Sequence, residues 1–241
     1  NSMTVDGVNL NDGFGLNANG YPGQQMPFPF DAIENVAVEL APFDVQYNGF
    51  TGCNINAVTK SGTNEFHGSV FYDYTDDSFK GDKTEGNDIT VNPFEEKRYG
   101  ATLGGPIIKD RLFFFGAYEK FEGPGASIDR GVEGSGAGTE VTGFTQADYD
   151  RVLAAAQNIY GYDPGGVPSA GPTYNEKYLM RLDGNITDNH RASITYNYDE
   201  GLSLSESDGD SNEFEFSKHL YQRGAETKSY SAQLFSNWTD N

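Results

Sequence analysis

Asn54-Ile-Asn-Ala-Val-Thr-Lys-Ser-Gly-Thr-Asn-Glu-Phe-His-Gly-Ser-Val-Phe-Tyr-Asp-Tyr74 separates two patterns in this sequence. Before it, the chain is rich in glycine and asparagine, which predicts a small, compact unit. After it, apolar and polar residues alternate in segments with tyrosine-rich ends, the pattern of β-strands with one apolar face. We therefore expect two domains, residues 1–64 and residues 65–241. Their joint would be Lys60, Ser61, Gly62 and Thr63.

The composition favours β-structure. Aromatic residues make up 14% of the 241 residues and are accompanied by 30 glycines, a mixture typical of strands, turns and aromatic belts. No run approaches the roughly 18 apolar residues of a membrane helix, but a strand of a membrane barrel needs only about 9–11 alternating residues. The net charge of −20 argues against nucleic acid as a partner, because phosphate repels an acidic surface.

Residues 1–64 predict a small α/β unit. A strand at residues 4–10 is interrupted by the turn signal Asp6-Gly7, and further strands are predicted at residues 36–40 and 53–59. A short helical turn is predicted at residues 30–36. Residues 11–29 form a loop of polar residues, glycine and proline with isolated aromatic side chains, and its length suggests a function. A connection that only packs its aromatic side chains is the alternative.

Six strands are predicted after the joint, at residues 65–74, 97–105, 112–121, 176–186, 191–199 and 228–237. Short turns at residues 106–111 and 187–190 alternate with long loops at residues 75–95, 122–173 and 200–224. Outer-membrane barrels show this asymmetry, with short periplasmic turns and long external loops. Tyrosines near the long loops suggest an aromatic girdle: Tyr72, Tyr74, Tyr118, Tyr196 and Tyr198.

The longest of these loops contains a predicted helix at residues 146–160. Thr145 and Asp148 resemble a capping box before it, and Gly161 suits the C-cap. Its apolar stripe is expected to pack on aromatic side chains of the loop itself, in preference to binding a ligand.

No residue pattern predicts catalysis or a strong metal site. His67, His190 and His219 are scattered, without triad or metal-ligand spacing around them, so we expect no enzyme. Alternate oxygen ligands, as in calcium loops, occur in Asp208, Asp210 and Asn212. The residue at the twelfth position is a histidine instead of a bidentate glutamate. A solvated acidic loop is therefore preferred over a weak calcium site, and no other cofactor is expected.

Several motifs resemble the TonB-dependent outer-membrane receptors, and in particular their Oar-like branch. They are Ile33-Glu-Asn-Val36, Asn54-Ile-Asn-Ala-Val-Thr-Lys-Ser-Gly62, Thr63-Asn-Glu-Phe-His-Gly68, Gly104-Gly-Pro-Ile107 and Lys109-Asp-Arg-Leu-Phe-Phe114. The resemblance implies a mainly β fold, a transmembrane antiparallel β-barrel of about 22 strands with an N-terminal α/β plug. Residues 1–64 would be the C-terminal part of the plug, and residues 65–241 the first six or so barrel strands with their external loops.

The resemblance also implies a function. A receptor in the outer membrane of a Gram-negative bacterium would bind an extracellular peptide, protein or glycan and import it with energy from TonB. Apical plug loops bind substrate in this family, which suggests as contacts here Phe14, Asn17, Asn19, Tyr21, Gln24 and Phe28. The TonB–ExbB–ExbD complex would act through a segment before Asn1. Outer-membrane lipid and lipopolysaccharide are further expected partners. Two alternatives remain: an outer-membrane adhesion or protein-export component, and a soluble glycan-binding β-domain.

Overall fold

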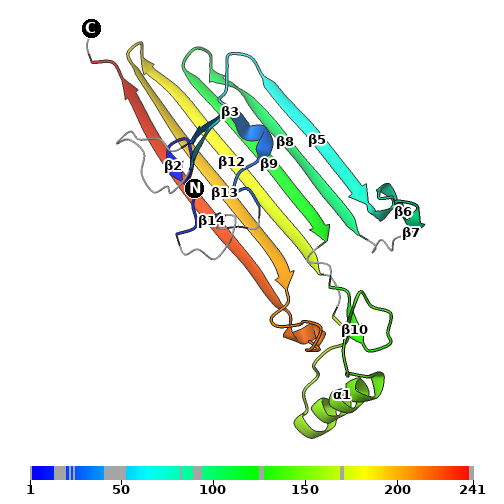
Figure 1. The fold of residues 1–241 in the computed structure, drawn as a ribbon. Helices are drawn as coiled ribbons and strands as arrows, with labels where there is room; N and C mark the ends of the chain where they lie inside the picture. Colours follow the sequence, from blue (N-terminus) through cyan, green and yellow to red (C-terminus); the bar gives the residue numbers. More distant parts are fainter. Residues whose placement is uncertain are drawn as a thin grey trace.

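The main feature of the fold is a six-stranded antiparallel sheet, called here the large sheet (Figure 1). The computed structural model describes residues 2–13, 20–21, 23, 25–40, 53–81, 83–88, 94–124, 128–168 and 171–238. The strands of the large sheet are β5 (His67–Asp76), β8 (Glu95–Ile108), β9 (Leu112–Pro124), β12 (Pro172–Thr187), β13 (His190–Ser205) and β14 (Tyr221–Ser236). Their order is β14-β13-β12-β9-β8-β5, so each strand pairs with its neighbours along the chain. Within the described residues the sheet stays open, as expected for part of a barrel.

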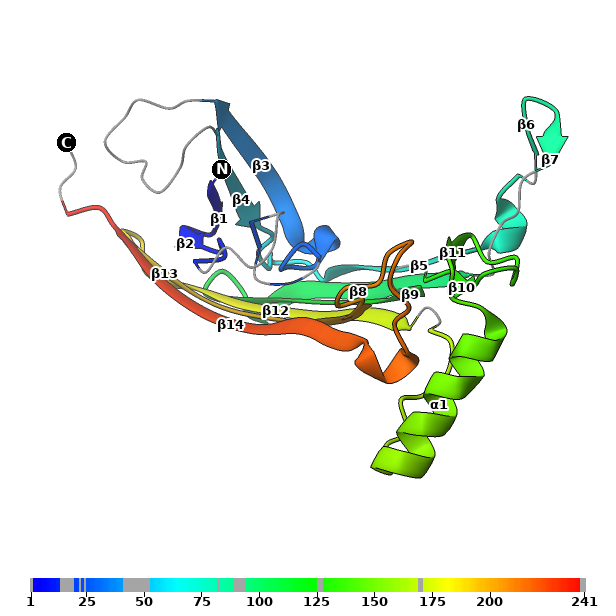
Figure 2. The same cartoon turned by 60° about the horizontal axis from the view of Figure 1, so that its bottom comes forward.

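A four-stranded sheet, called here the small sheet, lies over one face of the large sheet (Figure 2). Its strands are β1 (Ser2–Val5), β2 (Val8–Asn9), β3 (Ile33–Leu40) and β4 (Cys53–Thr59), in the order β2-β1-β4-β3. Asp6 and Gly7 make the predicted turn between β1 and β2, both with positive φ. The helical turn predicted at residues 30–36 is shorter, because only η1 (Phe30–Ala32) is helical and β3 begins at Ile33. β-Branched residues such as Ile33 and Val36 favour the extended conformation.

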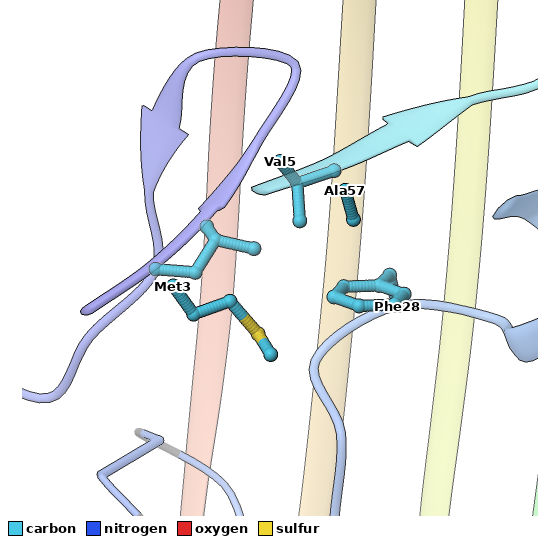
Figure 3. Packing of buried hydrophobic residues seen from close by; sticks show 5 residues of the cluster. Met3, Val5, Phe28 and Ala57 are labelled. Atoms are coloured by element: carbon cyan, nitrogen blue, oxygen red, sulfur yellow. The ribbon is translucent and has the colours of Figure 1, made fainter. Parts of the chain in front are cut away.

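A compact hydrophobic core belongs to the small sheet. Met3, Val5, Leu10, Phe28 and Ala57 are buried together, and Figure 3, which labels Met3, Val5, Phe28 and Ala57, shows these side chains in front of strands of the large sheet. Partly buried side chains pack around this core: Val8, Tyr21, Ile33 and Ile55. Two aromatic side chains of the segment before β3, Phe28 and Tyr21, therefore pack in or against this core. Packing of its aromatic side chains is the alternative role named for the loop at residues 11–29.

The large sheet extends further than the sequence pattern predicts. β5 has the predicted length, but the other five strands are longer, mostly toward the long loops. The extensions are polar, so they carry no apolar alternation, yet backbone pairing continues through them; Ser205, for example, still pairs with Tyr221. The loop predicted at residues 200–224 is therefore reduced to the residues between β13 and β14. The predicted positions of short turns and long loops are confirmed, at opposite ends of the sheet (Figure 1).

The two faces of the large sheet differ in character. The face away from the small sheet exposes large apolar side chains: Val70, Leu103, Met180, Leu182, Ile186, Ile194 and Leu234. The face toward the small sheet buries polar and charged ones, among them Glu119, Lys177, Asp183, Asn197 and Asp199. An apolar outer face and a polar inner face are the inverse of a soluble protein, and they suit a strand layer between lipid and a polar lumen. No helix among the described residues has the length and apolarity that a membrane crossing requires.

The long loops contain small elements of their own: η2 (Asp77–Phe79), β6 (Lys83–Thr84), β7 (Asn87–Asp88), β10 (Arg130–Val132), β11 (Thr139–Val141), α1 (Gln146–Tyr160) and η3 (Ser217–His219). The loop before β12 packs on the loop before β14. Arg130 donates two hydrogen bonds to Glu206, of 2.7 and 2.8 Å, and this guanidinium lowers the pKa of the Glu206 carboxyl. Tyr149 of α1 contacts the rings of Phe214 and Phe216. The prediction that α1 packs on aromatic side chains of its own loop is therefore wrong in its partner, because Phe214 and Phe216 belong to the loop between β13 and β14. Val152 and Ile159 of the apolar stripe are exposed.

Helix α1 has the predicted bounds, capping box and Gly161 C-cap. We expect Thr145→Ala to destabilise its first turn by about 1 kcal/mol, because the side-chain oxygen would no longer accept the Asp148 amide hydrogen bond. Hydrogen exchange of the first-turn amides should accelerate about 5-fold. Thr142→Ala, a nearby exposed threonine outside the helix, should leave the rate unchanged. Equal exchange in both variants would contradict a stabilising cap.

Candidate functional site between the two sheets

A buried ionic network joins the small sheet to the large sheet (Figure 2 shows the two sheets). Arg181 of β12 donates hydrogen bonds to the carbonyl and the hydroxyl oxygen of Thr59, of 3.1 and 2.9 Å, and lies 3.4 Å from Asp6. Asp6 in turn accepts hydrogen bonds from the amide and the hydroxyl of Thr59, of 3.0 and 2.6 Å. The guanidinium therefore helps to fix the β1–β2 turn and the end of β4 to the large sheet. The Gln233 side chain of β14 adds a hydrogen bond of 2.6 Å to the Asp6 carbonyl.

The network continues within the large sheet, where Arg181 donates two hydrogen bonds to Asp183, of 2.8 and 3.0 Å. Arg191 donates a further one of 3.0 Å to the same carboxylate. The side chain of Arg181 is 10% exposed and that of Asp183 1%, but that of Arg191 is 49% exposed. Only the buried arginine bridges the two sheets. Such a pair holds its partners in a defined geometry, and breaking one side of it leaves an unpaired buried charge.

The segment before β3 has its own polar anchors on the large sheet. The carbonyl of Pro27 accepts a hydrogen bond of 2.7 Å from Asn197, and the amide of Phe30 donates one of 2.8 Å to Glu119. The Asp31 carboxylate accepts one of 2.9 Å from Ser69. These three contacts engage β13, β9 and β5, so a short segment is fastened across almost the whole width of the sheet.

Two close approaches complete the interface. Ala32, fully buried, packs with Phe115, Ala117 and Leu179 of the large sheet. At the joint, Gly62 lies against the backbone of the large sheet, where a Cβ atom would meet backbone atoms of Gly105 and Phe114. Among the described residues, the buried apolar cluster that the two layers share is thus that of Ala32, and the hydrogen bonds across the interface join polar side chains to backbone groups or to other polar side chains.

A cavity of about 340 Å³ opens between the segment before β3 and the large sheet. The segment lines it with Tyr21, Gln25, Met26, Phe28 and Phe30, and the large sheet with Arg98, Glu119 and Lys177. Lys177 donates a hydrogen bond of 3.1 Å to Glu119. Arg98 lies over the ring of Phe121, 5.3 Å from its centroid. The cavity therefore combines aromatic walls with cationic and anionic groups, a lining that suits an amphipathic ligand.

The structure brings two of the predicted substrate contacts, Tyr21 and Phe28, to this cavity. The other four, Phe14, Asn17, Asn19 and Gln24, lie outside the described residues. Lys60, Ser61, Gly62 and Thr63 connect the end of β4 to β5, and the Lys60 amide donates a hydrogen bond of 2.8 Å to Ala32. A substrate-binding role for the six loop residues stays a prediction.

The proposed calcium loop is shaped by local hydrogen bonds. Asp210 accepts hydrogen bonds from the amides of Asn212 and Glu213, of 2.6 and 3.0 Å. Within the described ranges, no group of three or more histidine, cysteine, aspartate or glutamate side chains is arranged to hold a metal ion. Calcium binding by Asp208, Asp210 and Asn212 remains an untested expectation.

Sequence reasoning placed several residues of this interface on the correct face without finding their partners. Period-two alternation over residues 176–186 places Lys177, Arg181 and Asp183 on one face of that strand, and the alternation over residues 112–121 favours an inward-pointing Glu119; the structure has both arrangements. The available signal was a row of charged residues on the inner face of a membrane strand. Asp6, which completes the network, was recognised only as a turn residue.

Comparison with known proteins agrees with this architecture. Residues 58–127 match the family model described as an outer membrane beta barrel domain. A TonB-dependent transporter, Oar of Myxococcus xanthus, is 39% identical over 125 residues, which cover 49% of this chain and 11% of that protein. A protein of Acinetobacter baumannii named "Probable TonB-dependent siderophore receptor PirA" is 36% identical over 115 residues, covering 46% of this chain and 14% of that protein.

The chain is therefore part of a β-barrel protein of the Gram-negative outer membrane. Its relatives are TonB-dependent transporters and receptors, so the resemblance stated from the sequence motifs is confirmed. The alternative of a soluble β-domain is set aside, since the match is to a membrane barrel and the outer face of the large sheet is apolar. The chain spans only a small part of each of these relatives.

Proposed function

We propose that this chain belongs to a TonB-dependent receptor that imports an extracellular peptide, protein or glycan, with the small sheet as part of its plug. The observation that carries the proposal is the kind of contact between the two sheets. Arg181 holds the small sheet, and Glu119, Asn197 and Ser69 hold the segment before β3, through individual polar contacts, beside the buried apolar cluster around Ala32. When an interface opens, water can replace its polar contacts at a far lower cost in free energy than the exposure of a large apolar core to water. Such an interface suits a plug that must leave the wall and return.

The cavity beside the plug is proposed as part of the substrate path. Tyr21 and the exposed Phe30 would offer aromatic surface, while Arg98 would orient polar groups; Phe28 and Glu119, both buried, line the inner wall. The remaining contacts would come from Phe14, Asn17, Asn19 and Gln24 and from the long loops. Energy would reach the plug from the TonB–ExbB–ExbD complex. The receptor would change no covalent bond, so its action is binding and movement without catalysis.

A crosslink between plug and wall tests the proposal. Asp31→Cys and Ser69→Cys, made together in a Cys53→Ser background, would be joined by a short bis-maleimide across a contact of 2.9 Å. Cells carrying the intact receptor are given labelled oligopeptides and oligosaccharides, and label in the periplasm is measured. We expect uptake that requires TonB and falls at least 10-fold after crosslinking.

The controls separate the remaining explanations. Each single cysteine variant, treated with the same reagent, should transport like the parent. Uptake that persists without TonB, or with the crosslink in place, would contradict a pulled plug. Surface retention of a labelled protein without any import would favour the adhesion or export alternative.

A further inference from the structure

Arg98 lines the cavity between the segment before β3 and the large sheet, and it has no acidic partner among the described residues. Its guanidinium is half-buried and lies over the Phe121 ring, 5.3 Å from the centroid. Asp73, its register partner on β5, and Glu96, the next inward-facing residue of β8, form neither an ion pair nor a hydrogen bond with it in the described part of the chain. The aromatic ring therefore holds one face of the guanidinium, and the donor edge stays available to a ligand.

The other charged groups of this cavity, Lys177 and Glu119, neutralise each other. Lys177 donates a hydrogen bond of 3.1 Å to one carboxylate oxygen of Glu119, and the amide of Phe30 donates one of 2.8 Å to the other oxygen. Both charged side chains are buried. The neighbouring stretch of residues 13–29 contains no aspartate or glutamate, so it supplies no carboxylate to the guanidinium. The cavity is therefore rich in hydrogen-bond donors and poor in acceptors that still lack a donor.

The remaining walls of the cavity are aromatic and apolar. Met26 and Phe30 expose their side chains there, and Tyr21 and the buried Phe28 complete this part of the lining. A volume of about 340 Å³ is at the small end of the range for ligand pockets, so the cavity takes only a short part of a longer molecule. A sugar needs acceptors for its hydroxyl groups, because each hydroxyl carries a donor. A carboxylate beside an apolar side chain needs only donors and apolar surface, which are the groups that this cavity offers.

We propose that the cavity binds the C-terminal residue of an extracellular peptide, with the free carboxylate on Arg98 and the side chain against Met26 and Phe30. This inference rests on the proposed function and narrows its substrate class to peptides that end in an apolar residue. Two parallel N–H···O bonds join a guanidinium to a carboxylate, and a C-terminal amide or a neutral sugar cannot reproduce them. The arginine thus selects the free acid, and the apolar wall selects the last side chain.

A mixture of synthetic tetrapeptides, applied to the purified intact receptor without TonB, tests this assignment. Each sequence is present as the free acid and as the C-terminal amide, with every final residue represented, and mass spectrometry identifies the retained peptides. We expect free acids that end in leucine, methionine or phenylalanine to be retained at least 10-fold more than their amides. The reason is that the amide loses a charge-assisted hydrogen bond.

Variants of the cavity separate its two contacts. Arg98→Gln should remove the difference between acid and amide, and Arg98→Lys should keep only part of it, because an ammonium lacks the planar fork. Arg111→Gln is the matched control, since it removes an exposed arginine from the short turn at the other end of the sheet. Phe30→Ala keeps the backbone amide on Glu119 and should remove the preference for apolar final residues. Thermal unfolding of each variant verifies that the barrel is intact.

Three results with peptides would overturn the assignment: equal retention of acids and amides by the unaltered receptor, retention of no peptide, and an undiminished acid preference in Arg98→Gln. Competition by oligogalacturonate as strong as that of the free acids would also overturn it, and would assign the cavity to acidic glycans. Import by cells is a separate measurement. TonB-dependent import without these binding preferences would leave the transport proposal standing, whereas peptide binding without import would contradict transport alone.

Discussion

Replacing Arg181 with leucine is expected to release the small sheet from the large sheet. The variant removes the donor shared by Thr59, Asp6 and Asp183. One oxygen of the buried Asp183 carboxylate and the Thr59 carbonyl lose their Arg181 hydrogen bonds, while Asp6 keeps Thr59 and Asp183 keeps Arg191. Removing one side of a buried ion pair costs about 3–5 kcal/mol. In the purified receptor, hydrogen exchange of the β4 amides should therefore accelerate about 100-fold or more.

Arg191→Ala is the matched control for this experiment. Arg191 donates to the same Asp183 carboxylate, but it is half-exposed and contacts no residue of the small sheet among the described hydrogen bonds. Exposed ion pairs contribute about 0–1 kcal/mol, so the exchange rates of β4 should change less than about 5-fold. If both variants behave alike, Arg181 does not hold the two sheets together.

Gly62→Val is expected to have the second large effect, because the joint passes too close to the large sheet for any side chain. A Cβ atom at this position meets backbone atoms of Phe114 and Gly105, which cannot rotate away as a side chain can. Overpacking of this kind costs about 1–3 kcal/mol. We expect protease cleavage between β4 and β5 to accelerate about 5- to 150-fold under native conditions.

Gly13→Ala controls for the loss of a glycine, since a Cβ at Gly13 meets nothing within 4 Å. Its cleavage rate should match that of the parent protein. Comparable acceleration in both variants would indicate a general effect of glycine replacement, and would remove the argument for a tight joint.

Capping residues, turn residues and strand alternation are sufficient to predict much of this fold from the sequence. Helix α1 begins and ends where its caps predict, because each cap is complete within a few residues of sequence. The faces of the large sheet also follow from alternation alone, as the burial of Glu119 and the exposure of Met180 show. The polar ends of the strands were missed because pairing there depends on the neighbouring strand, and the apolar pattern has already ended.

The interface between the sheets could be predicted only in part. Alternation shows that Arg181 shares a face with Lys177 and Asp183, but its partners in the small sheet lie far away along the chain: Thr59 is 122 residues distant and Asp6 is 175. No periodicity links positions so far apart. The cavity could not be predicted for the same reason, since Tyr21 lies in the segment before β3 and Arg98 in β8 of the large sheet. The partners of Arg181 depend on how the small sheet packs on the large sheet, and no single segment of the sequence determines that packing.

The parallel pairing of β1 with β4 has a mechanical consequence. Ser2 pairs with Asn54 and Val5 with Ala57, so the N-terminal end of β1 and the C-terminal end of β4 lie at opposite ends of the pair. Tension applied at the start of β1 and resisted at Thr59 would therefore slide the two strands along each other. All hydrogen bonds of the pair would then bear load simultaneously, as in a shear clamp, whereas an antiparallel pair pulled from one end opens bond by bond. A force applied from the N-terminal side would therefore be transmitted to Thr59 and Arg181 before β1 and β4 separate.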